Sequence, residues 1–217
     1  MKTVFISAKS SIEKIEFDIS KIKDIKKIGI LTTVQFLHEI GKIKNYLTEQ
    51  GFDPIEGGQV LGCEFENANK IKDLVDGFLY IGSGNFHPIG ITLQTTKPVF
   101  IWHPGSDKLT EIDKSKIDQI QKKKKGMYTK FLSSKVIGVL VSTKPGQYNV
   151  QAKLDKLNKL KTEFPKKEFY FFLTNTFDFK ELDNFNFIES WINAMCPRIA
   201  EDINVLNYSD LETFNSN

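Results

Sequence analysis

The chain has 217 residues, of which 40% are hydrophobic and 26% are charged, and it includes 18 Phe residues. This composition excludes an intrinsically disordered protein and allows one large domain or two small ones. The formal net charge is only +3, so lysine-rich segments give local basic surface and nucleic-acid binding is weakly supported. The sequence contains no apolar run of about 18 residues and no signal-peptide pattern. We therefore expect a cytoplasmic protein with no membrane contact and no direct nucleic-acid contact.

The first half of the chain alternates short apolar runs with segments of helical period. Strands are predicted at residues 27–33, 52–56, 77–81 and 98–102, and helices at 34–50, 67–75 and 89–94. Glycine-containing loops are predicted at 57–63 and 82–88. Strands that alternate with helices indicate a parallel sheet.

The second half repeats this pattern after a helix or linker at residues 112–132. We expect strands at 136–141, 168–173 and 187–192, a helix at 149–163 and a short helix at 179–185. In both halves a first strand ends in a Thr-containing turn and a lone cysteine follows, which is consistent with an internal duplication. The predicted fold class is α/β, with two similar Rossmann-like domains, 1–110 and 111–217, whose small parallel sheets are flanked by helices.

The two cysteines, Cys63 and Cys196, lie far apart in a chain without an export signal, which disfavours a structural disulfide. Each is a buried small side chain or a ligand, and taken alone the buried thiol is the commoner case. The glycines before Cys63 would let the backbone approach a bulky group closely, and Pro197 fixes the chain direction after Cys196. Because parallel sheets bind ligands at the carboxyl ends of their strands, both cysteine loops could face one crevice.

The loop that contains Gly82, Ser83, Gly84 and His87 is similar to loops that cradle phosphates or nucleosides, but it lacks the spacing of the dinucleotide fingerprint. His87 is a core histidine, a substrate contact or a proton carrier, and the sequence leaves these alternatives open.

A second strand-end turn contains Lys144, Gly146 and Gln147. Its cation and its amide could hold a carboxylate or the edge of an adenosine, and a plain βα turn is an equal alternative. His38 and His103 offer no spacing suited to a zinc site with the cysteines.

Five motifs, taken together and in order, resemble the diphthamide-synthesis family of archaea, the 2-(3-amino-3-carboxypropyl)histidine synthases. They are residues 32–35 (TTVQ), 58–63 (GQVLGC), 80–88 (YIGSGNFHP), 142–147 (STKPGQ) and 196–199 (CPRI). The resemblance covers nearly the whole chain, starting with a strand at 3–7. It implies the second and third of the family's three similar domains, without the N-terminal one.

The resemblance implies the first step of diphthamide biosynthesis. This step transfers a 3-amino-3-carboxypropyl group from S-adenosylmethionine to a histidine of translation elongation factor 2. In the family, a 4Fe-4S cluster held by one cysteine from each of three domains supports this radical chemistry.

Carried over by motif, Cys63 and Cys196 match the second and third cluster ligands. Arg198 would bind the methionine carboxylate in a charge-assisted pair, and Gln147 would help to hold S-adenosylmethionine. The other residues that the resemblance assigns to this cofactor region are Gly82, Ser83, Gly84, His87, Lys144 and Gly146. No residue is assigned as a catalytic acid or base.

The sequence departs from the family pattern because the first cluster cysteine is missing. A separate N-terminal-domain polypeptide could supply it, or a dimer mate could, and the intact cysteine motifs favour the separate polypeptide. An electron-donor protein is a further implied partner. The alternative function is a non-catalytic accessory or binding subunit of a diphthamide-synthesis complex. A nucleotide-binding module unrelated to iron would leave the paired cysteine motifs unexplained.

Overall fold

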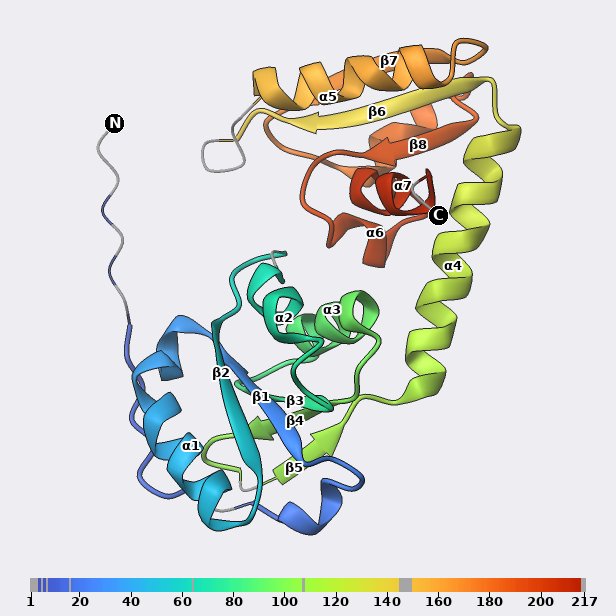
Figure 1. Cartoon of the computed structure of the whole chain (residues 1–217). Coiled ribbons are helices and arrows are strands. Elements are labelled where there is room, and N and C mark those ends of the chain that lie inside the picture. The colour runs from blue at the N-terminus through green and yellow to red at the C-terminus, as the bar shows by residue number, and fades with distance from the viewer. Residues whose placement is uncertain are drawn as a thin grey trace. The chain divides into compact units, whose positions relative to one another are not determined.

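The computed structural model describes residues 4, 6, 8–15, 17–63, 65–106, 108–144 and 150–215. It divides into two compact units, Met1–Asp118 and Gln119–Asn217, each built on one small sheet (Figure 1). Two small, mostly parallel sheets flanked by helices confirm the predicted α/β fold class. Among the described residues, no helix combines the length and the apolar character needed to cross a bilayer.

The sheet of the first unit has the strand order β2-β1-β3-β4-β5. The strands are β1 (Lys27–Thr32), β2 (Asp53–Gln59), β3 (Gly77–Ile81), β4 (Val99–His103) and β5 (Lys108–Glu111). β1 to β4 are parallel, and β5 pairs antiparallel with β4. The helices are η1 (Ile19–Lys21), η2 (Val34–Glu39), α1 (Ile40–Glu49), α2 (Glu66–Ile71) and α3 (Phe86–Thr95).

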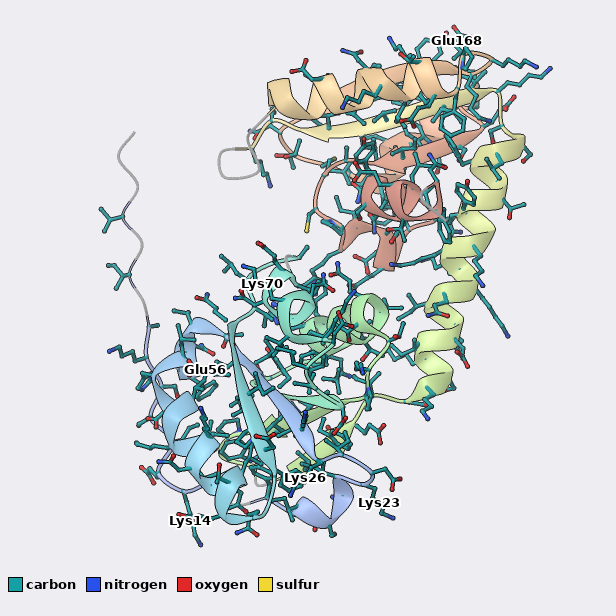
Figure 2. All side chains as sticks on the ribbon, viewed as in Figure 1. Lys14, Lys23, Lys26, Glu56, Lys70 and Glu168 are labelled. Carbon is teal, nitrogen blue, oxygen red and sulfur yellow. The ribbon has the colours of Figure 1, made fainter. Side chains whose placement is uncertain are left out.

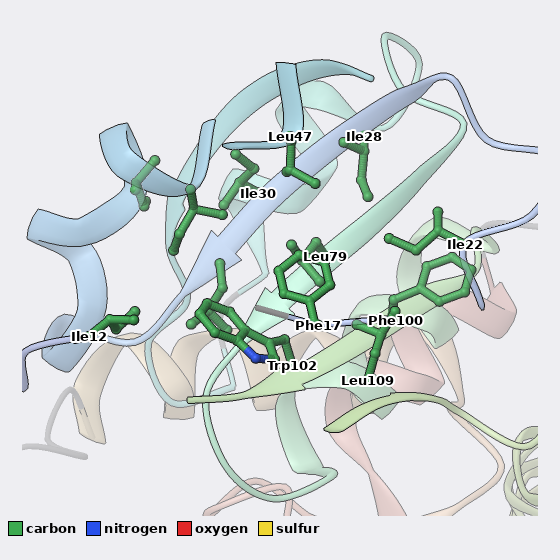
Figure 3. Close-up of a cluster of buried hydrophobic side chains, with 13 residues drawn as sticks. Ile12, Phe17, Ile22, Ile28, Ile30, Leu47, Leu79, Phe100, Trp102 and Leu109 are labelled. Carbon is green, nitrogen blue, oxygen red and sulfur yellow. The ribbon is translucent and has the colours of Figure 1, made fainter. Parts of the chain in front are cut away.

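The central strands of this sheet are buried on both faces, which explains their continuous apolar sequences. On one face, Ile28 and Ile30 of β1 pack with α1 and with Phe17 of the N-terminal segment (Figure 3). The Phe17 ring lies 5.0 Å, centroid to centroid, from that of Trp102. On the other face, the core contains side chains of α2 and α3. Helices therefore cover both faces of the sheet.

The sheet of the second unit is fully parallel, with the order β7-β6-β8-β9. Its strands are β6 (Val136–Ser142), β7 (Glu168–Thr174), β8 (Ser190–Asn193) and β9 (Leu206–Asn207). The remaining helices are α4 (Lys114–Ser133), α5 (Val150–Glu163), η3 (Phe179–Asn184), α6 (Ile199–Asp202) and α7 (Tyr208–Asn215). Phe131 of α4 is fully buried in the core of this unit.

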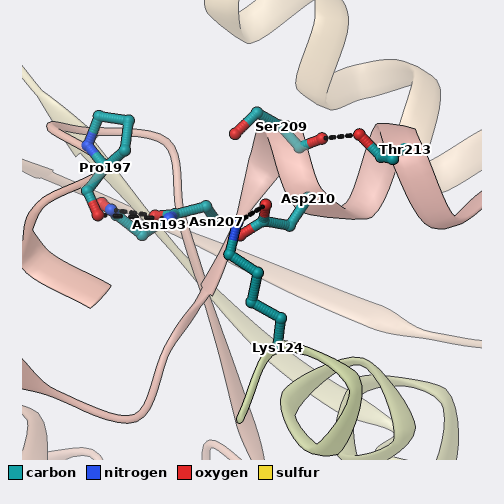
Figure 4. Close-up of polar contacts among 7 residues, drawn as sticks. All are labelled: Lys124, Asn193, Pro197, Asn207, Ser209, Asp210 and Thr213. Atoms are coloured by element: carbon teal, nitrogen blue, oxygen red, sulfur yellow. Dashed lines mark hydrogen bonds and ion pairs between the residues drawn. The ribbon is translucent and has the colours of Figure 1, made fainter. Parts of the chain in front are cut away.

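Charged side chains cover the outside of both units. Figure 2 labels Lys23, Lys26, Glu56 and Glu168 among the exposed ones. The lysine run of α4 is not only a solvated surface, because Lys124 forms a 2.7 Å ion pair with Asp210 of α7 (Figure 4).

In each unit, a carboxylate before the third strand hydrogen-bonds to backbone N–H groups at the start of the first strand. We call this contact a carboxylate bracket. The Asp76 carboxylate, just before β3, accepts hydrogen bonds from the N–H groups of Lys26 (3.0 Å) and Lys27 (2.7 Å) at the start of β1. Glu189, just before β8, accepts the N–H of Lys135 at the start of β6 in the same way. An equivalent contact at an equivalent point of each unit supports the internal duplication.

In each unit, a glycine of the first strand packs against an aromatic ring of the third strand. A Cβ on Gly29 of β1 would lie 2.7 Å from the Phe78 ring of β3, and a Cβ on Gly138 of β6 would lie 2.4 Å from the Trp191 ring of β8. Each glycine is paired in register with its aromatic residue. Both units therefore use the same packing at the centre of the sheet.

The predicted glycine loop at 57–63 was partly wrong, because β2 continues to Gln59. The pairing of β1 with β2 shifts register at Gly57, and a Cβ there would lie 2.7 Å from the Leu31 side chain. This glycine is needed for packing within the sheet.

The second glycine loop was predicted too long. α3 begins at Phe86, so His87 lies in its first turn, where the missing N–H of Pro88 costs no helical hydrogen bond. The helix predicted at 34–50 begins as the 3-10 helix η2, and the strand predicted at 187–192 is β8, shifted toward the C-terminus.

Short elements were missed, namely β5, β9, α6 and α7. Of the strand predicted at 3–7, residues 3, 5 and 7 lie outside the described residues. Val4 and Ile6 are exposed and belong to no strand.

Candidate functional site

The functional candidates of the first unit lie where its parallel strands end. β1 leads to α1 on one face of the sheet and β3 leads to α3 on the other, so their carboxyl ends form a switch point of the kind that binds ligands in open α/β sheets. The buried Thr32 hydroxyl donates a 2.8 Å hydrogen bond to the carbonyl of Ile81 and joins the two strand ends. Next to it, the buried Thr33 Oγ1 has no hydrogen-bond partner among the described residues.

Cys63 lies half-buried on the loop that follows β2, and it is not in a disulfide. The Asn67 side chain closes this loop with a 2.7 Å hydrogen bond to the carbonyl of Gln59. Phe65 anchors the loop on α3, since a Cβ on Gly90 would lie only 2.1 Å from its ring. The same ring lies 6.5 Å, centroid to centroid, from Phe86. The Cys63 loop and the start of α3 therefore form one packed region.

His87 is held by a buried tyrosine that sequence reasoning did not single out. The Tyr80 hydroxyl lies 3.1 Å from His87 Nδ1, and burial raises the pKa of Tyr80 to about 12. The hydroxyl is therefore protonated near neutral pH and can donate to Nδ1 of a neutral ring, which leaves the imidazole proton on Nε2. Gly82, at φ +152°, allows this contact, because a Cβ there would lie 2.8 Å from the tyrosine oxygen.

The remaining loop residues of the first unit are less enclosed. Ser83 and Gly84 are exposed, and Gly84 has a φ of +77°, which favours glycine. Ser83 and Gly84 therefore form an exposed turn just before α3.

In the second unit the corresponding switch point lies between β6 and β8. Ser142 ends β6, is buried, and accepts the N–H of Lys144 at 3.2 Å. The Lys144 side chain is exposed. Gly146 and Gln147 lie outside the described residues, so their assignment to S-adenosylmethionine stays a prediction.

Cys196 lies half-buried on the loop that leaves β8, and Arg198 is exposed at the N-cap of α6. Two buried asparagines, Asn193 and Asn207, bind this loop through their side chains (Figure 4). Beside the loop is a hollow of about 200 Å³. It is lined by Leu157, Asn193, Ala194, Met195, Pro197, Asn207, Tyr208 and Ser209.

Cys63 and Cys196 do not occupy equivalent positions in the two units. This corrects the interpretation that each repeat carries its cysteine at the same place. Cys63 follows the second strand of its unit, whereas Cys196 follows the third strand of its own. The counterpart of the Cys196 loop in the first unit is the loop from Gly82 to His87. That both cysteine loops face one crevice stays a prediction, since each unit is described by itself.

The donor chemistry fits an iron–sulfur cluster, because thiolates are its ordinary ligands. Among the described residues, no group of three or more His, Cys, Asp or Glu side chains that could hold a metal ion occurs. Tyr80, Asn193 and Asn207 are the site residues that sequence reasoning missed. Each asparagine follows only two apolar residues, Trp191-Ile192 and Val205-Leu206, which is too short a run to single it out.

Together the fold and these loops define a two-unit α/β protein with a thiol at the carboxyl edge of each parallel sheet. The family described as "Putative diphthamide synthesis protein" matches residues 1–210, and the chain belongs to this family.

Similar proteins carry the name 2-(3-amino-3-carboxypropyl)histidine synthase. The protein from Pyrococcus horikoshii is 30% identical over 213 residues, which cover 92% of this chain and 60% of that protein. The protein from Methanocaldococcus jannaschii is 31% identical over 219 residues, 95% of this chain and 58% of the relative. In Encephalitozoon cuniculi the similar protein is named subunit 1 of this synthase, with 27% identity over 81% of this chain and 51% of the relative. The chain therefore spans between half and three fifths of the length of these relatives.

The crystal structure of Dph2 from Pyrococcus horikoshii with a 4Fe-4S cluster has a similar fold. It matches with a TM-score of 0.74 and 30% identity, over 90% of this chain and 59% of that chain.

Proposed function

We propose that this chain acts in the first step of diphthamide biosynthesis, the transfer of a 3-amino-3-carboxypropyl group from S-adenosylmethionine to a histidine of translation elongation factor 2. The supporting observation is that its two cysteines lie half-buried on strand-end loops, in a family with a member solved with a 4Fe-4S cluster. The domains carrying the site are residues 1–110, with Cys63, and 111–217, with Cys196.

The chain's residues would bind and orient the cofactor and substrate. Cys63 and Cys196 would hold the cluster as thiolates, and the cluster would supply the electron for reductive cleavage of S-adenosylmethionine. The exposed guanidinium of Arg198 would bind the methionine carboxylate. The Nε2–H of a neutral His87 would donate a hydrogen bond to a substrate acceptor.

The other residues assigned to S-adenosylmethionine would shape its surroundings. Gly82, Ser83 and Gly84 would let the backbone approach it closely. Lys144, Gly146 and Gln147 would add a cation and an amide on the turn after β6.

The cluster needs a further cysteine, which we assign to the part of the family's length that this chain does not span, on the same polypeptide or on a partner chain. That relatives are named as a numbered subunit supports assembly with another chain. The further partners would be elongation factor 2 as the substrate protein and an electron-donor protein.

Anaerobic iron–sulfur reconstitution, with and without a candidate first-domain polypeptide, tests this proposal. The complete assembly should bind about four irons and show cluster absorbance. Cys63→Ala and Cys196→Ala should each strongly reduce both. Leu61→Ala is the matched control, because Leu61 is 67% exposed on the Cys63 loop and carries no donor atom.

Absence of a cluster in every combination would overturn the catalytic assignment. If product still forms at an unchanged rate with both alanine variants, the chain is the accessory subunit of the alternative function instead.

A further inference from the structure

Two asparagines form a buried pair beneath the Cys196 loop. Asn193 ends β8 and Asn207 ends β9, and the two are paired in register on neighbouring parallel strands. Their exposures are only 2% and 8%. Asn193 Nδ2 donates a 2.8 Å hydrogen bond to Asn207 Oδ1 (Figure 4).

The pair binds three consecutive residues of the loop. Asn193 Oδ1 accepts the N–H of Met195 at 3.0 Å, and Asn193 Nδ2 donates to the carbonyl of Cys196 at 2.9 Å. Asn207 Nδ2 donates to the carbonyl of Pro197 at 3.2 Å. The side chains of Asn193 and Asn207 therefore restrain the backbone at Cys196 and on either side of it.

The hydrogen bonds fix the orientation of the Asn193 amide. Turning it over would place its oxygen against the carbonyl of Cys196 and against Asn207 Oδ1, and its NH₂ group against the N–H of Met195. Only one orientation satisfies all three contacts, and a buried amide is strongly held to the orientation that satisfies it. The pair thus selects one loop conformation.

The loop's backbone provides part of its restraint. Pro197 has no N–H to donate, and α6 has only four residues. The backbone supplies two hydrogen bonds, from the N–H of Ile199 to the carbonyl of Cys196 at 3.1 Å and from the N–H of Ala200 to the carbonyl of Pro197 at 3.2 Å. The asparagine side chains add three hydrogen bonds to these two, and one of the three restrains Met195, which neither backbone bond does.

We propose that Asn193 and Asn207 are positioning residues that hold the Cys196 loop, and hence its thiol, in a fixed conformation before any cofactor binds. Its relevance to catalysis rests on the proposed role of Cys196 as a cluster ligand. The restraint itself is a property of the cluster-free chain. A preorganised ligand loop lowers the ordering cost of binding.

The test uses the cluster-free full chain in a Cys63→Ser background, in which Cys196 is the only thiol. The alkylation rate of Cys196 by iodoacetamide is measured for Asn193→Ala and Asn207→Ala, which add no charge near the thiol. We expect alkylation to be faster in Asn193→Ala by at least about fivefold, the factor for one hydrogen bond of ordinary net strength, because this variant loses three. The backbone amide of Met195 should also exchange faster with solvent. Asn186→Ala, an exposed asparagine of the same unit, is the control.

Alkylation and Met195 exchange equal to those of the control would overturn the proposal. If Asn193→Ala does not fold, Asn207→Ala decides by the same two measurements, because it removes only the contacts to Pro197 and Asn193. Failure to reconstitute a cluster in every combination with a first-domain polypeptide would overturn the proposed function and leave this result standing.

Discussion

At the scale of single residues, burial determines the protonation state next to the first unit's loop. Tyr80 is fully buried in a mostly apolar core, so its ionised form is strongly disfavoured. Its hydroxyl stays neutral and lies 3.1 Å from His87 Nδ1, so it can donate to the ring or accept from it, depending on the tautomer of the histidine. In either case the contact fixes the orientation of the His87 ring.

The raised pKa of Tyr80 predicts a loss of stability in alkali. Unfolded tyrosine ionises near pH 10, whereas the folded side chain ionises near pH 12. Its contribution is fully present below about pH 10 and is lost as the pH rises through 12, by roughly 3 kcal/mol in total. Urea denaturation at pH 8 and 11 should show a smaller loss for Tyr80→Phe than for the unmutated chain. An equal loss in both proteins would contradict this assignment.

At the scale of elements, Lys167 hydrogen-bonds to backbone carbonyls at the C-terminal end of α4. The Lys167 ammonium donates to the carbonyls of Phe131 (2.7 Å), Leu132 (2.8 Å) and Ser134. It also lies 4.9 Å from the centre of the Phe131 ring. Burial lowers the pKa of Lys167, and the negative charge of Glu189 partly opposes this. The last carbonyls of a helix are satisfied here by one cation.

Lys167→Met should therefore destabilise the second unit by roughly 1–3 kcal/mol, because these carbonyls lose their donor. Lys166→Met is the matched control, since Lys166 is exposed, and should change stability by less than about 0.5 kcal/mol. Urea denaturation of both variants measures the difference. Equal stabilities would show that water replaces the ammonium without cost.

The contact between α3 and the Cys63 loop depends on the absence of a side chain at Gly90. Gly90→Ala should destabilise the first unit by roughly 1–3 kcal/mol, because Phe65 is buried and must be displaced. Gly41→Ala is the control, since nothing lies within 4 Å of that position in α1. There alanine should stabilise by up to about 1 kcal/mol. Thermal unfolding compares the two, and a stabilising Gly90→Ala would refute the packing argument.

At the scale of the whole molecule, two units with separate hydrophobic cores repeat the same carboxylate bracket. Backbone hydrogen bonds from Lys27 and Lys26 lower the pKa of Asp76, and those from Lys135 and Val136 lower the pKa of Glu189. A lowered folded-state pKa stabilises above the ordinary value near pH 4, and this stabilisation disappears as the pH falls through the folded-state value.

Asp76→Asn and Glu189→Gln should each weaken the acid dependence of stability in their own unit. The indole N–H signals of Trp102 and Trp191, one in each unit, can follow urea denaturation at pH 7 and 3. The effects should be additive in the double variant, because the residues share no partner. A change at Trp191 caused by Asp76→Asn alone would contradict the independence of the two cores.

The sequence by itself determined the alternation of strands and helices, because apolar periodicity is local and the strands buried on both faces read as continuous apolar runs. It also located the cysteine loops by their motifs. Short elements such as β5 and α6 were not predicted, because four residues are too few to show a hydrophobic period. Only the tertiary structure revealed Tyr80 behind His87 and the asparagine pair beneath Cys196. The contacts of Asn193 with the loop are local in sequence, but burial and the pairing of β8 with β9, which no local pattern encodes, place Asn207 beside them.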